Sequence, residues 1–346
     1  MIAGKYSIRI HQLLSRFFGD QGFHSYFATI KLVKELELVD PDIIILHNLH
    51  GYYLHLPTLF DYIRRFNKPV YWVLHDCWPF TGHCTHFIVN KCCKWQTECA
   101  TCDQQNKYPY SWFFDRSREL FRRKKEMLTG IQNLTLIAPS QWLANHVQKS
   151  FLKEYPVHVI NNGIDLSVFN PTESDFRARY QIENKIMLLG VASCWSNYKG
   201  LDVFVELAHR LDSDRYQIVL VGTDEDIQRK LPSNIVSIRR TENQPQLAQI
   251  YSAADIFINP TREDNYPTVN MEALACGTPV ITFDTGGAAE ILGNGDGVVI
   301  KNNSIQSLIE TIQSVYSTDY DSKAIAEAAS RFSEKLCFEK YFELIM

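Results

Sequence analysis

Two acidic residues in one loop–helix segment are the side chains of this sequence best suited to a ligand site. Asp264 precedes Glu272 by eight residues within 259–281, where an apolar run (AADIFI) leads into a polar loop, a helix expected to open near 267–270, and a second apolar run (PVITF). A helix N-terminus presents unpaired N–H groups and the positive end of its dipole, which suits a phosphate. A carboxylate one turn further in can accept hydrogen bonds from ribose hydroxyls. The segment predicts a site for a nucleotide sugar. The alternative is an ordinary strand–helix connection that binds no ligand, with an acidic surface loop and a glycine that caps the C-terminus of the helix.

A lysine in a second strand–loop–helix segment fits the same kind of site. Residues 190–208 (GVASCWSNYKGLDVFVELA) read as a buried strand, a short loop and a helix that starts near Lys199. A lysine at the carboxyl end of a strand can neutralise a departing diphosphate. Ser193 and Trp195 share this loop, and Trp195 packs either beside the ligand or in the core. Taken alone, a lysine in such a loop is more often a solvated surface residue.

Histidines follow two predicted strands in the first half of the chain. The run at 43–46 ends in His47 and Asn48, with His50 close behind, and the run at 70–74 ends in His75 and Asp76. Open α/β sheets bind ligands at the carboxyl ends of their strands. We therefore expect these side chains to border a binding crevice, although a lone histidine is usually structural or solvated.

Five of the nine cysteines fall within a short segment. Cys84, Cys92, Cys93, Cys99 and Cys102 lie in residues 84–102, within a stretch at 77–110 that has little apolar periodicity and also contains Cys77. A C-x2-C pair has the spacing of a zinc knuckle, and two further thiols complete a tetrahedral site that leaves no open catalytic position. Structural zinc is the favoured interpretation because it would replace a missing core; free thiols and disulfides are the alternatives.

Composition limits the class of protein. The chain has 346 residues, 45% hydrophobic and 21% charged, with a net charge of −4, which gives no reason to expect nucleic acid as the main partner. No run approaches the ~18 apolar residues of a membrane span, and the N-terminus lacks the apolar core of a signal peptide. We expect a cytoplasmic protein. The basic stretch 116–125 is expected to be a solvated face, with peripheral contact to anionic lipid at the inner face of the cell membrane as the weaker interpretation.

Strand and helix patterns alternate along the chain in two series. The apolar runs are continuous rather than alternating, which is typical of parallel sheets covered on both faces. We predict an α/β fold with two Rossmann-like domains, residues 1–153 and 154–330, followed by a helix at 331–346 that crosses back onto the first domain. The predicted strands are 43–46, 70–74, 134–138, 157–160, 186–192, 216–222, 255–259, 279–283 and 297–300.

Residues 22–346 resemble bacterial glycosyltransferases of family 4, which have the GT-B fold, particularly the colanic-acid-like group of exopolysaccharide and O-antigen assembly. The resemblance rests on the strings FATIKLVKELELVDPDIIILHNLHGYYL, LHDCWPFTGHC and EDNYPTVNMEALACGTPVITFDTGG. Such enzymes normally begin with a strand, a glycine-rich loop and a helix, and this sequence starts after that unit, near IRIHQLL. The resemblance implies parallel sheets that face an interdomain cleft, and a truncated first domain.

The resemblance also implies roles for single residues. Lys199 would stabilise the diphosphate, and Glu272 would hold the ribose. His75 and Asp264 would contact the donor sugar. Two positions depart from the family: Asp264 stands where a glutamate is usual, and Ser193 where an arginine is common. The remaining implied positions are Asn265, Tyr266, Pro267 and Thr268 for the donor; His47, Asn48, His50 and Asp76 for the acceptor; and Cys84, Cys92, Cys99 and Cys102 for the metal, with Cys92 fitting better than Cys93.

The resulting expectation is a retaining glycosyltransferase whose chemistry needs no metal or other cofactor. It would move a sugar from a nucleoside-diphosphate sugar to a saccharide acceptor, expected to be lipid-linked. Two rivals stay open: a GT-B nucleotide-sugar epimerase, and a donor-binding scaffold with weak or no turnover.

Overall fold

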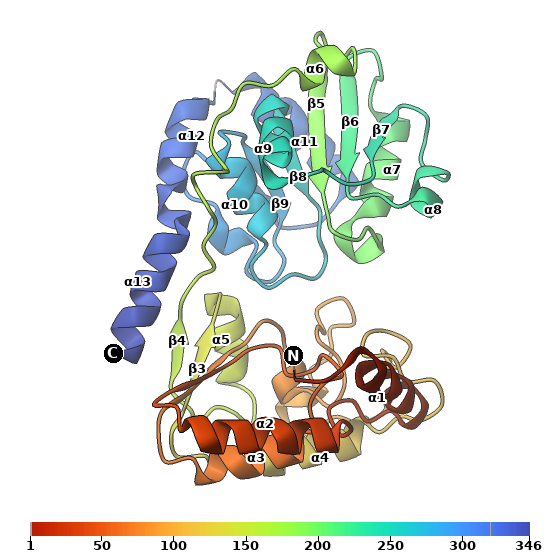
Figure 1. Ribbon diagram of the computed structural model, residues 1–346. Coiled ribbons are helices and arrows are strands. Elements are labelled where there is room, and N and C mark those ends of the chain that lie inside the picture. Colours follow the sequence, from red (N-terminus) through yellow and green to blue (C-terminus); the bar gives the residue numbers. More distant parts are fainter. Residues whose placement is uncertain (1, 319) are drawn as a thin grey trace. The chain divides into compact units, whose positions relative to one another are not determined.

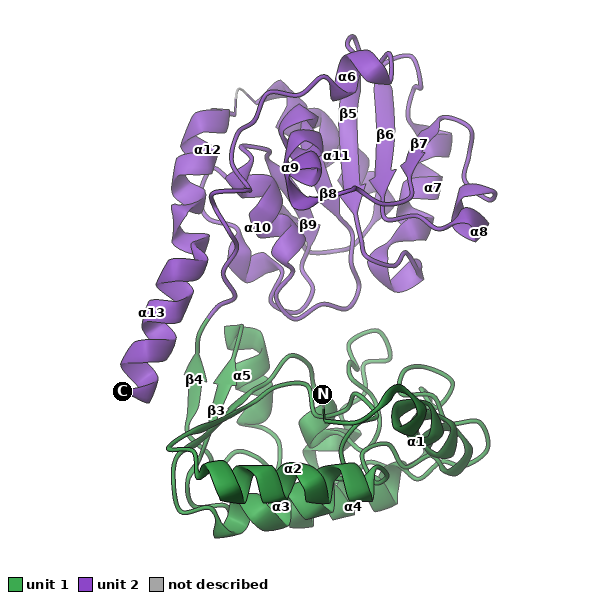
Figure 2. Cartoon of the chain, in the orientation of Figure 1, with its two compact units in different colours: residues 1–160 green, residues 161–346 purple. Residues whose placement is uncertain are grey.

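The protein consists of two compact units, residues 1–160 and residues 161–346, each built around its own parallel β-sheet (Figures 1 and 2). The computed structural model describes residues 2–318 and 320–346. None of the helices in that part of the chain has the length and apolar character needed to cross a bilayer. Residues 154–160 pack with the first unit, and the C-terminal helix belongs to the second.

The sheet of the first unit has four parallel strands in the order β1-β2-β3-β4. Leu46 of β1 pairs with Trp72 of β2, so these two strands end side by side and their following loops are neighbours. The elements are β1 Ile44–Leu46, β2 Val70–Val73, β3 Leu134–Ala138 and β4 Val157–Val159, with helices α1 Lys5–Phe18, α2 Tyr26–Val39, α3 Leu56–Arg65, α4 Ser117–Leu128 and α5 Gln141–Val147.

The sheet of the second unit has six parallel strands in the order β10-β9-β8-β5-β6-β7. Counted from β5 as the first strand, this is the 3-2-1-4-5-6 order of dinucleotide-binding folds, with its switch point between β5 and β8. The elements are β5 Ile186–Val191, β6 Tyr216–Val221, β7 Ile235–Ile238, β8 Ile256–Asn259, β9 Val280–Phe283 and β10 Gly297–Ile300, with helices α6 Phe176–Arg179, α7 Leu201–Arg210, α8 Glu225–Gln228, α9 Gln244–Ala253, α10 Thr268–Ala275, α11 Ile305–Ser317, α12 Ser322–Ala328 and α13 Glu334–Ile345.

Both faces of the second sheet are buried, which explains why its central strands are predominantly apolar rather than alternating between polar and apolar residues. Successive side chains of a strand point to opposite faces. Met187 and Leu189 of β5 pack in the core cluster that contains residues of α9 and α10, whereas Ile186 and Leu188 pack in the cluster that contains residues of α7 and α11. The predicted doubly covered parallel sheet is therefore confirmed.

Each predicted strand run contains an observed strand, but the sequence reading missed β7. This strand lies at the edge of the sheet, and only Ile235 of its four residues is fully buried. A short, half-exposed edge strand lacks the continuous apolar run that marked the others.

Candidate functional site

A pocket of about 320 Å³ lies at the switch point of the second sheet. Open α/β sheets bind ligands at this position because the connections from adjacent strands diverge there. The loops after β5 and β8 and the start of α10 supply its walls. The lining residues are Val191, Ala192, Ser193, Trp195, Lys199, Ile258, Asn259, Pro260, Asp264, Tyr266, Pro267, Thr268 and Val269.

The structure pairs two of the predicted site residues directly. Lys199 ends a short 3₁₀ turn (Asn197–Lys199), and its Nζ lies 2.6 Å from Oδ2 of Asp264. The other carboxylate oxygen of Asp264 accepts the backbone N–H of Asn265 at 2.9 Å, which fixes the side chain. Their side chains are 38% and 18% exposed, so both charges reach the pocket. An ammonium group carries more than one N–H donor, so Lys199 can hold Asp264 and still bind a phosphate oxygen.

Glu272 lies on α10 but does not line this pocket. Its Oε2 accepts a hydrogen bond of 3.0 Å from the hydroxyl of the buried Tyr251 on α9. Burial raises the pKa of Glu272. The hydrogen bonds from Tyr251 and Thr268 favour the ionised form and partly offset this increase. The carboxylate is therefore held in place by its own neighbours.

Trp195 is packed in the core and also lines the pocket. It is 5% exposed, and its Nε1 donates to the carbonyl of Val221 at 2.9 Å. Its ring meets Phe204 edge-on at 5.4 Å, and it also forms part of the pocket wall. Of the predicted donor residues, Asn265 is buried, and neither Asn265 nor Glu272 is among the residues that line the pocket.

Sequence reasoning missed two residues that shape the pocket from below. Asn259, the last residue of β8, donates from its side chain to Oδ1 of Asn270 on α10 at 2.7 Å, tying the strand to the helix. Gly286, after β9, has a φ of +58°, and a Cβ there would lie 1.7 Å from the carbonyl oxygen of Asp264. The glycine pair in DTGG was the available signal, since a glycine often permits a close backbone approach.

We expect Gly286→Ala to weaken donor binding by about tenfold or more, because the added methyl must displace the Asp264 loop. Gly295→Ala is the matched control: Gly295 has a φ of +89°, and nothing lies within 4 Å of a Cβ there. Gly295→Ala therefore introduces the backbone strain of a positive φ without a steric clash. Calorimetric titration of both variants with the nucleotide measures the difference. Equal affinities would show that the Asp264 loop tolerates displacement.

The predicted histidines of the first unit do come together at the ends of β1 and β2. Nδ1 of His47 lies 3.0 Å from Nε2 of His75. Nε2 of His50 lies 2.8 Å from Oδ2 of Asp76, and the hydroxyl of Tyr108 lies 2.9 Å from Nδ1 of His50. Asn48, with a φ of 31°, turns the loop between these histidines and leaves its side chain exposed.

Electrostatics divide this histidine cluster into a neutral pair and an ionised carboxylate. Burial lowers the pKa of His47, and burial together with His47 lowers the pKa of His75. The pKa of Asp76 is also lowered: burial opposes ionisation, but the contacts with His50 and the N–H of Trp78 outweigh it. Near neutral pH, His47 and His75 are therefore neutral imidazoles that accept or donate a hydrogen bond, beside a carboxylate that stays ionised.

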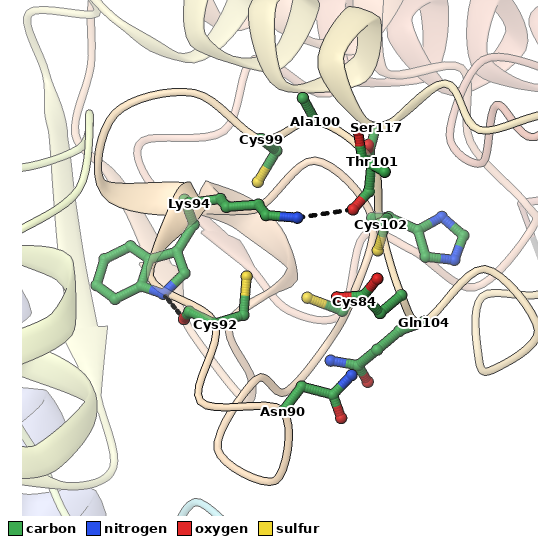
Figure 3. Close-up of a pocket in the computed structure, with 13 residues that line it drawn as sticks. Cys84, Asn90, Cys92, Lys94, Cys99, Ala100, Thr101, Cys102, Gln104 and Ser117 are labelled. Carbon is green, nitrogen blue, oxygen red and sulfur yellow. Dashed lines mark hydrogen bonds between the residues drawn. The ribbon is translucent and has the colours of Figure 1, made fainter.

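The cysteine segment gathers around a small pocket, with Cys84, Cys92, Cys99 and Cys102 among its lining residues (Figure 3). Cys93 is exposed and lies outside the lining. Across residues 2–318 and 320–346, no three His, Cys, Asp or Glu side chains form a ready-made metal-holding group. The sequence reading also underestimated the core here, because Phe80, Phe87 and Trp95 are buried and the last two rings stack at 4.8 Å.

The basic stretch 116–125 is extensively ion-paired. Arg116 contacts Asp20 and Glu119, and Arg122 contacts Glu98 at 2.6 Å. These pairs reduce the net positive charge that this face of α4 presents.

Two family models match the chain. Residues 4–168 match Glycosyltransferase Family 4, and residues 173–332 match Glycosyl transferases group 1. Escherichia coli K12 WcaC, a glycosyl transferase named for colanic acid biosynthesis, is 26% identical over 88% of this chain and 73% of its own length. A Campylobacter jejuni N-acetylgalactosaminyltransferase, named for a diphospho-undecaprenol-linked substrate, is 28% identical over 56% of this chain and 55% of its own length.

The solved structures agree on the fold. Anabaena HepE in complex with UDP superposes with a TM-score of 0.65 at 17% identity, covering 92% of this chain and 81% of that one. Since the two family models together account for nearly the whole sequence, the chain belongs to the family 4 glycosyltransferases and has the GT-B fold.

Proposed function

We propose that this glycosyltransferase moves a sugar, with retention of its anomeric configuration, from a nucleoside-diphosphate sugar to a lipid-linked saccharide in surface polysaccharide assembly. The observation that carries the proposal is the Lys199–Asp264 ion pair at the switch-point pocket. The names of the relatives support the substrate classes: a colanic acid enzyme, an enzyme acting on a diphospho-undecaprenol-linked substrate, and a structural neighbour in complex with UDP.

In this proposal the second unit binds the donor. Lys199 and the first N–H groups of α10 hold the diphosphate, where a preorganised charge stabilises the leaving group. Asp264 and the loop 265–268 contact the sugar, and Glu272 accepts hydrogen bonds from the ribose. Ser193 and Trp195 form the wall of the donor pocket. Because Asp264 already holds Lys199, the diphosphate enters a pocket whose ammonium group is oriented before the donor arrives.

The transfer step exchanges one bond at the anomeric carbon for another. The bond from that carbon to the diphosphate oxygen breaks, and the bond from the acceptor oxygen forms on the same face of the sugar. The acceptor proton passes to the departing diphosphate oxygen, so no side chain acts as a nucleophile. The negative charge that develops on the leaving group falls beside Lys199, and no divalent metal is needed to neutralise it.

The first unit serves the acceptor side in this proposal. His47, Asn48, His50 and Asp76 bind the saccharide, and His75 contributes to the reaction as a hydrogen-bonding group for the sugar. Two properties of the cluster support these roles. Burial lowers the pKa values of His47 and His75 and keeps these two imidazoles neutral, and the neighbours of Asp76 keep its carboxylate ionised. Polyhydroxylated ligands are bound by such mixed donors and acceptors.

The test is a transfer assay with a panel of nucleoside-diphosphate sugars and diphospholipid-linked saccharide acceptors. We expect a glycosylated acceptor whose new linkage has the anomeric configuration of the donor, at a rate that added Mg²⁺ or Mn²⁺ does not raise. Nuclear magnetic resonance of the product reads the linkage. An inverted linkage would overturn the retaining mechanism.

Two other outcomes would favour the rival functions. Release from the donor of a free sugar with one inverted ring carbon, without any acceptor, would indicate a nucleotide-sugar epimerase. Donor binding by calorimetry without turnover, across the whole panel, would indicate a scaffold.

A further inference from the structure

Four thiols of the first unit surround a single small space. Cys84, Cys92, Cys99 and Cys102 come from separate turns of residues 77–110, and their sulfurs point into the same pocket (Figure 3). Its enclosed volume is about 20 Å³, which is room for one water-sized atom or ion. The four thiols are near enough to influence one another electrostatically, since each of the others acts on Cys84.

The backbone around the pocket is adapted to a sulfur that accepts hydrogen bonds. The N–H of Gly82 donates to Sγ of Cys99 at 3.2 Å. A Cβ at Gly82 would lie 2.2 Å from the carbonyl oxygen of Ser117 and 2.8 Å from Cβ of Cys99, so only glycine allows this approach. Hydrogen bonds of this kind orient and stabilise the thiolate ligands of metal sites.

A buried cation lies beside the thiols. Lys124 is 1% exposed, its Nζ donates to the carbonyl of Trp78 at 2.6 Å, and it lies 3.9 Å from the centre of the Trp78 ring. Burial lowers the pKa of Lys124 to about 7, and the neighbouring Cys99, Cys84 and Asp76 act in the opposite direction. A buried charge is unfavourable unless an opposite charge compensates it. Four thiolates around a divalent ion carry a net negative charge, which would supply that compensation.

We propose that Cys84, Cys92, Cys99 and Cys102 bind one structural zinc ion. The four sulfurs face one pocket but are not yet spaced as a metal-holding group, so the proposal requires them to draw closer together around the ion. By binding all four thiolates, the ion would cross-link the loops of residues 77–110, which also contain the aromatic cluster of Phe80, Phe87 and Trp95. The site is separate from the transfer chemistry, because four thiolates leave zinc no open position for substrate.

Adjacent cysteines provide a matched pair of variants. Cys92 lines the pocket, whereas Cys93 is exposed and does not. We expect the full-length protein, purified under reducing conditions with zinc supplied and then dialysed against a chelator, to retain about one zinc per chain. Cys93→Ser should retain the same amount, and Cys92→Ser should lose nearly all of it. Elemental analysis counts the metal, and titration with a thiol reagent should release it.

Cobalt substitution tests the geometry without any mutation, and it decides the question if Cys92→Ser does not fold. Co²⁺ bound by four thiolates gives the intense visible absorption of a tetrahedral site. The proposal is overturned by wild-type protein that takes up neither metal, by a weak octahedral spectrum, by equal zinc in both variants, or by a disulfide among the four cysteines after reducing purification. Loss of zinc from Cys93→Ser alone would also overturn it.

Discussion

Lys199→Ala is expected to lower kcat by about 10²–10³-fold, the typical effect of removing one preorganised charge at a leaving group. The side chain is 38% exposed and its ion pair with Asp264 is at the surface, so its contribution to folding is about 0–1 kcal/mol. The loss should therefore appear in turnover and leave thermal unfolding nearly unchanged. The variant also leaves the Asp264 carboxylate beside the diphosphate with no compensating ammonium.

Lys323→Ala is the control for this variant. Lys323 also forms a surface ion pair in the second unit, with Glu327 at 3.9 Å, but it lies on α12 and outside the pocket. Steady-state rates with saturating donor should be unchanged for Lys323→Ala and reduced for Lys199→Ala. Turnover of Lys199→Ala within threefold of wild type would show that Lys199 is a surface residue with no part in transfer.

The sequence predicted the strands that frame the switch-point pocket, because local patterns determine them. Continuous apolar runs place β5 and β8, and the polar residues that follow each run must lie at the carboxyl edge of a parallel sheet. Lys199 and Asp264 are 65 positions apart, and their ion pair depends on the strand order, which periodicity does not reveal. The resemblance placed both at one ligand, but only the structure shows that they bind each other.

The missed features share a physical cause, which is that they depend on long-range packing. Gly286 matters because its Cα approaches the Asp264 carbonyl, and Asn259 matters because Asn270 faces it from another element. The glycine pair in DTGG is compatible with a close approach but does not reveal its partner, and the Asn259–Asn270 contact leaves no local signature. In the cysteine segment, the sequence analysis underestimated the buried core. Phe80, Phe87 and Trp95 do not have the spacing of a helix or a strand, yet their rings form a buried cluster.

Glu272 presents a sharper test of donor recognition, because its carboxylate is fixed by neighbours that can be changed separately. We expect Glu272→Ala to abolish measurable binding of the nucleoside diphosphate, since it removes the acceptor for the ribose hydroxyls. Tyr251→Phe removes the hydrogen bond to Oε2 but keeps the carboxylate, so it should weaken binding by only about tenfold. Titration calorimetry of both variants measures the difference.

The pH dependence of donor binding separates this role of Glu272 from a loss of stability. Burial raises the pKa of the Glu272 carboxyl group in the folded protein above its value in the unfolded chain. The contribution of this group to folding stability is therefore greatest at a pH below the unfolded-state pKa, and it is lost as the pH rises through the folded-state pKa. At neutral pH the ionised carboxylate therefore opposes folding, and Glu272→Gln should unfold at the same temperature as wild type or higher. Wild-type donor affinity should fall as pH decreases through the raised pKa, because protonation removes acceptor capacity, while Glu272→Gln should bind weakly at every pH. Full affinity in a folded Glu272→Gln or Glu272→Ala protein would remove the carboxylate from the donor site and leave Tyr251 and Thr268 as its only partners.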